Sequence, residues 1–140
     1  AIMRALSATA RDYFERLHHV GALNPSEPEV AAACVGEPIS GDILQLHLQA
    51  NPRGLIVAVR FKAYGCGWLI ACGSLLAECM EGRMLAEIGH FRHHQLVKEL
   101  DIPPEKLHCA VLAETALKAA RRALVAKSTG PHFHNLLLNT

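Results

Sequence analysis

The sequence predicts an α+β domain in which an antiparallel sheet carries helices on one face. Segments with the composition of strands occur between residues 30 and 63, whereas helical periodicity dominates from residue 68 onward. The two best-defined strands are joined by the short turn 51–54, and so short a connection permits only antiparallel pairing. With 140 residues, 51% of them apolar, the chain can bury one core, so residues 1–140 are expected to form a single domain.

A helix and three strands are expected in the first half of the chain. Residues 8–19 are expected to be helical, because Tyr13, Phe14 and Leu17 fall on one side. The predicted strands are 30–36, 43–50 and 55–63. The first consists of small or β-branched residues, the second alternates apolar and polar residues, and the third is rich in Val, Ile and Phe. The second strand is therefore expected to have one solvent-facing side.

The second half of the chain is expected to be helical. The predicted helices are 68–80, 85–100 and 107–127. The middle one is interrupted at Gly89, and the last has a continuous apolar stripe. On that last helix Glu114 and Lys118 have the spacing of an i,i+4 ion pair. Residues 128–140 are expected to be a flexible tail.

Composition and charge argue against several classes of protein. The formal net charge is +1, and a nucleic-acid binder needs a concentrated excess of Lys and Arg to contact phosphates. No apolar run approaches the roughly 20 residues of a membrane-spanning helix, and the first residues lack the apolar core of a signal peptide. The five cysteines are odd in number and irregularly spaced, which fits a reducing compartment. We therefore expect a cytoplasmic protein that contacts neither nucleic acid nor membrane.

Three breaks between regular elements each carry a potential metal ligand. They are Ser40-Gly41-Asp42, Gly65-Cys66-Gly67 and Leu107-His108-Cys109. Cys66 and Cys109 are each expected at or near a helix N-terminus. Unpaired N–H groups and the helix dipole there favour the thiolate, which is the form that binds metal. The glycines beside Cys66 leave room for an approaching ion.

The residues at these breaks offer two sulfurs, one nitrogen and one oxygen. Asp42, Cys66, His108 and Cys109 would suit tetrahedral zinc or an iron centre, although the chain has no CxxC pair of the zinc-finger kind. Neighbouring residues on a helix point about 100° apart. His108 and Cys109 therefore share one site only if the first helical turn is irregular. From the residues alone, Asp42 can equally be a turn residue and His108 a helix cap.

The remaining cysteines and histidines fit structural roles. Cys72 and Cys79 are seven residues apart on one apolar helical face, and together with Cys34 they are expected to fill the core. The other histidines that lie on separate elements are expected at the solvated surface: His18, His19, His93, His94, His132 and His134. A hydrolase built on Cys109 is disfavoured, because the adjacent His108 does not face it along a helix as a general base would.

Three segments carry a likeness to a known family. They are Val35-Gly36-Glu37-Pro38-Ile39-Ser40-Gly41-Asp42, Phe61-Lys62-Ala63-Tyr64-Gly65-Cys66-Gly67, and Pro103-Pro104-Glu105-Lys106-Leu107-His108-Cys109 followed by Leu112-Ala113-Glu114. In this order and spacing they resemble the IscU-type and NifU N-terminal iron–sulfur scaffold family, over residues 13–126. The resemblance implies a three-stranded antiparallel sheet with helices packed on it. It also implies a scaffold rather than an enzyme: one that receives iron, takes sulfur from a cysteine desulfurase, assembles a [2Fe–2S] cluster and passes it to acceptor apoproteins.

The resemblance further implies which residues hold the cluster or iron. Asp42, Cys66, His108 and Cys109 match the family's aspartate, second cysteine, histidine and third cysteine, but the first cysteine falls on Ser40. A serine hydroxyl is a hard, weakly acidic ligand, whereas iron in a cluster favours thiolate. Two interpretations stay open. One is a working scaffold, and the other is a divergent zinc-binding member that acts as a regulatory or sulfur-machinery partner without cluster assembly.

The resemblance also implies a contact with an Hsp70-type chaperone. The segment that corresponds to the family's chaperone motif is Ile102-Pro103-Pro104-Glu105-Lys106. It keeps two prolines and the lysine of the motif, and it adds a negative charge.

Overall fold

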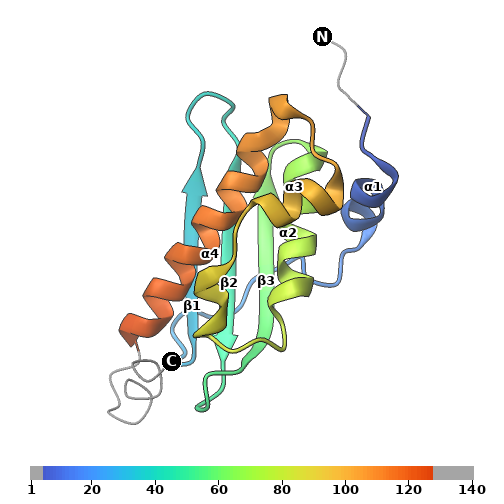
Figure 1. Ribbon diagram of the computed structural model, residues 1–140. Helices are drawn as coiled ribbons and strands as arrows, with labels where there is room; N and C mark the ends of the chain where they lie inside the picture. The colour runs from blue at the N-terminus through green and yellow to red at the C-terminus, as the bar shows by residue number, and fades with distance from the viewer. Residues whose placement is uncertain (1–4, 128–140) are drawn as a thin grey trace.

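The computed structural model describes residues 5–127, which form one sheet covered on one side by helices (Figure 1). The helices, 3-10 turns and strands are, in chain order, α1 (Ala8–Glu15), β1 (Val30–Gly36), β2 (Ile43–Ala50), β3 (Ile56–Tyr64), α2 (Gly67–Met80), η1 (Glu87–His90), α3 (His94–Leu100), η2 (Pro104–Lys106) and α4 (Leu107–Lys127). The strand order is β1-β2-β3, and both pairs are antiparallel. The predicted α+β class with a three-stranded antiparallel sheet is confirmed. The predicted tail 128–140 lies outside the described residues.

The alternation along β2 gives the sheet a dry face that the helices cover. Leu44, Leu46 and Leu48 are fully buried on that face. In Figure 1, α4 runs across β1 and β2, α2 lies over β3, and α1 packs on α2. Burying each leucine contributes about 1.5–3 kcal/mol to folding. None of the helices in the part of the chain that the structure describes has the length and apolar character to cross a bilayer.

Two helices differ in extent from the sequence-based prediction. The helix predicted at 8–19 ends at Glu15, because the chain beyond it pairs with the free edge of β3. The Phe61 N–H donates to the His19 carbonyl at 2.8 Å, and the Gly21 N–H donates to the Phe61 carbonyl at 2.9 Å. The helix predicted at 85–100 is divided into η1, which contains Gly89, and α3. The three strands match their predicted bounds within one residue.

Gly73 sets how closely α2 approaches β3. A Cβ atom added at this position would lie 2.6 and 2.7 Å from two ring carbons of Phe61. Phe61 is itself 1% exposed, so its ring has no free space into which it can turn. The absence of a side chain at residue 73 therefore allows the helix to lie directly on an aromatic ring of the sheet.

Gly73→Ala is expected to destabilise the protein by about 1–2 kcal/mol. Overpacking a close-packed core typically destabilises by about 1–3 kcal/mol, and the gain in helix propensity from Gly to Ala, about 1 kcal/mol, offsets only part of it. Urea denaturation of both proteins measures the difference. Phe61→Leu combined with Gly73→Ala should show a favourable coupling energy, because the smaller side chain vacates the ring position. A Gly73→Ala protein as stable as the wild type would contradict the packing described.

The sheet face opposite the helices carries a buried histidine. His47 is 3% exposed in the middle of β2, and its Nδ1 accepts the N–H of Leu23 at 2.6 Å. The proton of the neutral ring therefore lies on Nε2, which has no hydrogen-bond partner among the described residues. Burial lowers the pKa of His47, and the charge of Lys62 lowers it further. The ring is thus held neutral, and its hydrogen bond ties the chain before β1 to the sheet.

Acidification is expected to destabilise the protein partly through His47. Its pKa is lower in the folded state than in the unfolded state, so the unfolded state binds more protons and the contribution to stability is lost as pH falls through the ordinary histidine range. One such proton changes the free energy of unfolding by at most about 1.4 kcal/mol per pH unit. Urea denaturation between about pH 5 and pH 8 should show a shallower slope for His47→Gln than for the wild type. The exposed-site control His90→Gln should retain the wild-type slope, and an unchanged slope in His47→Gln would refute the assignment.

Candidate metal centre

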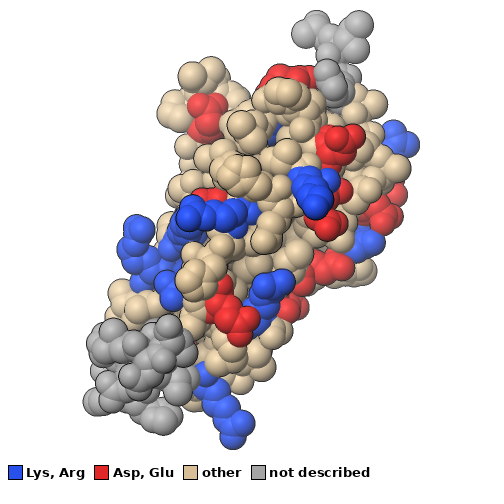
Figure 2. Space-filling model, in the orientation of Figure 1, with Lys and Arg blue, Asp and Glu red and all other residues tan. Residues whose placement is uncertain are grey.

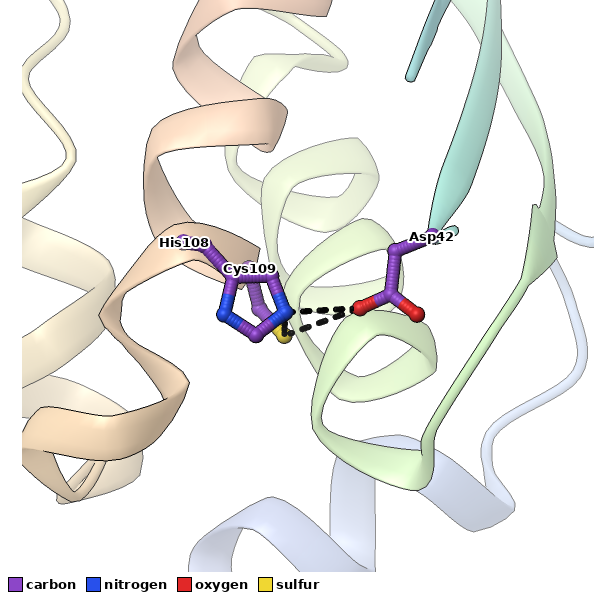
Figure 3. Close-up of side chains that lie close together, drawn as sticks. All are labelled: Asp42, His108 and Cys109. Carbon is purple, nitrogen blue, oxygen red and sulfur yellow. Dashed lines mark hydrogen bonds and ion pairs between the residues drawn. The ribbon is translucent and has the colours of Figure 1, made fainter. Parts of the chain in front are cut away.

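The three predicted breaks meet at one end of the sheet. Gly36 of β1, Ile43 of β2 and Tyr64 of β3 lie side by side in the register. The β1–β2 loop and the β3–α2 junction therefore occupy the same end. The start of α4 lies against them, so that Asp42, His108 and Cys109 point toward one another (Figure 3).

The β1–β2 loop is closed by hydrogen bonds that fix the position of Asp42. The Glu37 N–H donates to the Asp42 carbonyl at 2.8 Å, and the Gly41 N–H donates to the Glu37 carbonyl at 2.8 Å. Gly41 has φ +78°, a conformation that favours glycine. The Glu37 carboxylate accepts the N–H groups of Ile39 and Ser40. These hydrogen bonds, led by those of Ser40, lower the pKa of Glu37.

The Asp42 carboxylate is held against a glycine and a histidine. Its Oδ2 lies 2.8 Å from Nε2 of His108, and the residue is 7% exposed. A Cβ atom added at Gly65 would lie 2.3 Å from Asp42 Oδ1 and 2.7 Å from Asp42 Cγ. The carboxylate thus occupies the space that any side chain at residue 65 would fill.

His108 and Cys109 reach one site although they are neighbours on a helix. The Cys109 Sγ lies 3.6 Å from His108 Nε2 and 3.8 Å from Asp42 Oδ2. The longer histidine side chain reaches back, so its ring lies beside the cysteine sulfur (Figure 3). The three ligand-capable atoms all lie within 4.8 Å of one another, close enough for one ion to contact all three.

Cys66 joins this group through Cys109. Cys66 is the N-cap residue of α2, and its Sγ lies 3.6 Å from the Sγ of Cys109. The hydrogen bond between the two sulfurs lowers the pKa of Cys66 to about 5 in spite of partial burial. The Leu69 N–H and the Lys106 charge act in the same direction. The same hydrogen bond, together with burial, raises the pKa of Cys109. The expectation that both helix N-termini favour a thiolate is therefore wrong for Cys109, because burial and the neighbouring thiolate outweigh the helix dipole.

Ser40 lies in the exposed part of the loop, two residues from the aspartate. Its Oγ accepts the Asp42 N–H at 3.2 Å, so the hydroxyl supports the backbone of the loop. The four remaining candidates, Asp42, Cys66, His108 and Cys109, supply one carboxylate, two sulfurs and one imidazole. That donor set is chemically suited to zinc or to an iron centre without any contribution from serine.

A comparison with known protein families covers most of the chain. Residues 6–129 match the family described as the NifU-like N terminal domain. The chain belongs to that family. The iron-sulfur cluster assembly scaffold protein IscU of Azotobacter vinelandii is 43% identical over 118 residues, which cover 84% of this chain and 92% of the relative. IscU of Haemophilus influenzae is 40% identical over 116 residues, which cover 83% of this chain and 92% of that protein.

Solved structures show the same fold. The N-terminal part of a nitrogen-fixing NifU-like protein from Brucella abortus superposes with a TM-score of 0.69 at 18% identity, covering 87% of this chain and 95% of that one. A putative scaffold protein for the SUF system from Fervidobacterium islandicum gives a TM-score of 0.63 at 18% identity. The superposition covers 82% of this chain and 95% of that one. At these identities the likeness concerns the fold of the NifU-like domain alone.

The other cysteines of the NifU-like domain differ in burial. Cys72 is fully buried, as predicted, and Cys79 is half-buried. The prediction that Cys34 fills the core is wrong. Its cross-strand partner is Gln45, so it faces the sheet side that the helices leave uncovered.

Two histidines expected at the solvated surface instead pair with carboxylates. His19 Nε2 lies 2.9 Å from Glu81, and His93 Nδ1 lies 3.0 Å from Glu114. Glu114 also accepts the Lys118 ammonium at 2.8 Å, which confirms the predicted i,i+4 pair. His132 and His134 lie outside the described residues.

Two residues near the centre were not identified from the sequence. Glu37 organises the loop that holds Asp42, and Lys106 places a cation near Cys66. For Glu37 a local sequence signal exists, because an acidic residue stands at the start of the turn 37–42. Lys106 lies near Cys66 only because η2 leads directly into α4 beside α2. That is a tertiary relationship.

Proposed function

We propose that this chain is a scaffold on which iron and sulfide are assembled into a [2Fe–2S] cluster, bound by Asp42, Cys66, His108 and Cys109. The observation that carries the proposal is the convergence of these four side chains from three separate segments. The names of the IscU relatives support it. Thiolates bind cluster iron tightly, whereas a carboxylate is a harder and weaker ligand for it. Asp42 would therefore keep the cluster transferable to acceptor apoproteins.

Sulfur would come from a cysteine desulfurase and enter through Cys66. Cys66 is half-buried, whereas Cys109 is fully buried, so an incoming persulfide meets Cys66 first. The Cys66 thiolate attacks the outer sulfur of the desulfurase persulfide, the S–S bond breaks, and the enzyme's cysteine leaves as a thiolate, so that Cys66 carries the persulfide. A two-electron reductant supplied by a partner protein then cleaves this persulfide, which releases sulfide for the cluster and returns Cys66 as a thiolate. In this role the chain accepts and carries sulfur and is not an enzyme. All five cysteines are free thiols, which fits a reducing cytoplasm.

Only a short part of the segment 102–106 is accessible to a chaperone. Ile102 and Pro103 are buried, and Pro104–Lys106 forms the 3-10 turn η2 directly before α4. An Hsp70-type chaperone that reads the segment in an extended form would have to unwind this turn, which lies beside the metal centre. Such docking would thereby couple chaperone binding to cluster release.

Zinc binding without cluster assembly is the second candidate function. The observation that favours it is Ser40, whose hydroxyl already accepts the Asp42 N–H. The four other donors suffice for tetrahedral zinc. In this case the chain would act as a regulatory partner of the sulfur machinery.

Anaerobic reconstitution with ferrous iron and sulfide distinguishes the two functions. We expect a visible cluster chromophore with about two irons per cluster in the wild type and in the exposed-site control Cys34→Ser. Cys66→Ala and Cys109→Ala should lose it. Tightly bound stoichiometric zinc with no cluster in the wild type would favour the second function. A chromophore that survives both alanine substitutions would refute the ligand assignment.

A further inference from the structure

A basic pocket lies on α4, away from the metal centre. It has a volume of about 300 Å³ and is lined by Gly89, Lys118, Arg121, Arg122 and Val125. Figure 2 shows Lys and Arg side chains gathered over α4. Residue 118 is three and four positions before residues 121 and 122, which are four and three positions before residue 125, so all four share one face of the helix. We call this cavity the α4 pocket.

One arginine of the α4 pocket is fixed in position by the fold. The Arg121 Nε–H donates to the Leu85 carbonyl at 2.7 Å. Its guanidinium lies against Gly89, where an added Cβ would be 3.1 Å from the guanidinium carbon. The terminal nitrogens, with four N–H donors, form no ion pair within the described residues. This guanidinium is therefore oriented in advance and retains donors for a ligand.

Within the part of the chain that the structure describes, carboxylates do not balance the charge of the α4 pocket. Of its three cations, Lys118 pairs with Glu114, whose other oxygen accepts the His93 N–H. Arg121 and Arg122 have no carboxylate partner in the part of the chain that the structure describes. Two positive charges thus remain at one cavity in a protein whose formal net charge is +1.

We propose that the α4 pocket binds a phosphate group carried by a small molecule. Phosphate carries about two negative charges near neutral pH, which matches the two unpaired arginines, whereas one carboxylate would neutralise only one of them. Arginine presents a planar fork that bonds phosphate oxygens in pairs. Val125 offers an apolar wall for a small organic part, and the volume is at the lower end of ligand pockets, about 300–1,000 Å³. The inference is independent of the proposed scaffold function.

Titration of the whole chain with inorganic phosphate and with pyrophosphate, at ionic strength held constant with chloride, tests the proposal. Amide NMR shifts should saturate at Gly89 and along residues 118–125, and they should leave Asp42 and Cys66 unchanged. Arg122→Gln, which changes an exposed side chain, should weaken binding by about tenfold, the effect of losing one charge-assisted hydrogen bond. The matched control Arg11→Gln, on the exposed side of α1, should bind as the wild type does.

Three outcomes would overturn the proposal. Shifts that rise linearly without saturation would indicate only nonspecific ionic contact. Equal weakening in Arg122→Gln and Arg11→Gln would indicate a diffuse charge effect. Binding of an oligoglutamate peptide more tightly than pyrophosphate would show that the pocket serves protein docking instead. Arg121→Gln removes the second unpaired arginine and should also weaken phosphate binding. Thermal unfolding of each variant shows whether the fold is retained.

Discussion

Gly65→Ala is expected to lower the affinity of the centre for zinc by about 10–100-fold, the range seen when a group that orients a metal ligand is changed. The new Cβ would lie 2.3 Å from Asp42 Oδ1, so the carboxylate has to turn away. Turning breaks the 2.8 Å contact between Asp42 Oδ2 and His108 Nε2 and separates two of the three converging ligands. The Leu69 side chain lies 3.1 Å from the same Cβ position, so the new methyl group cannot move away from Asp42 in that direction.

Competition with a chromophoric chelator measures this loss, and thermal unfolding shows whether the domain stays folded. Gly67→Ala is the matched control in the same segment. Its added Cβ would meet Leu6 and Phe14 at 3.3–3.4 Å, contacts that small side-chain shifts relieve, so its zinc affinity should stay near that of the wild type. Full zinc affinity in Gly65→Ala would mean that Asp42 is not a ligand.

Elements with an uninterrupted pattern could be predicted from the sequence. Along β2 the alternation of leucines with polar residues gave both the strand bounds and the buried face, because one side of that strand packs on helices throughout. The long helix 107–127 was predicted with its observed bounds, since its apolar stripe continues for the whole length.

Elements shaped by distant partners could not be predicted. Helix α1 ends before its predicted bound because His19 and Gly21 form backbone hydrogen bonds with Phe61 at the edge of β3. No local sequence pattern indicates that these residues will pair with that edge. His19 and His93 likewise depend on carboxylates from other elements. These contacts are tertiary, and propensity carries no information about them.

The candidate centre shows the same division. Its four donors were recognisable because each stands at a break between regular elements. Their electrostatics were not, since the pKa values of Cys66 and Cys109 move apart only when the two sulfurs lie 3.6 Å from each other in a buried site. The tight fit of Gly65 against Asp42 is also a through-space relation between residues 23 positions apart in the sequence.

Ser40→Cys is expected to lengthen the lifetime of a reconstituted cluster by about tenfold or more, which corresponds to at least about 1.4 kcal/mol. Residue 40 lies two positions before Asp42, with its Oγ directed at the Asp42 N–H at 3.2 Å. A thiolate there would add a third sulfur donor beside the carboxylate. Cluster iron binds thiolate in preference to a hydroxyl, which is harder and keeps its proton at neutral pH.

Decay of the visible cluster absorbance under challenge with a chelator measures that lifetime. Ser26→Cys is the matched control, because it adds a thiol at an exposed serine of the 24–29 loop, outside the residues that form the centre. The control should decay like the wild type, and Ser40→Cys should decay more slowly while binding the same amount of iron. Equal decay in all three proteins would mean that the β1–β2 loop does not contact the cluster at residue 40. Asp42 would then be the sole ligand from that loop, and the serine would serve only to hold its backbone in place.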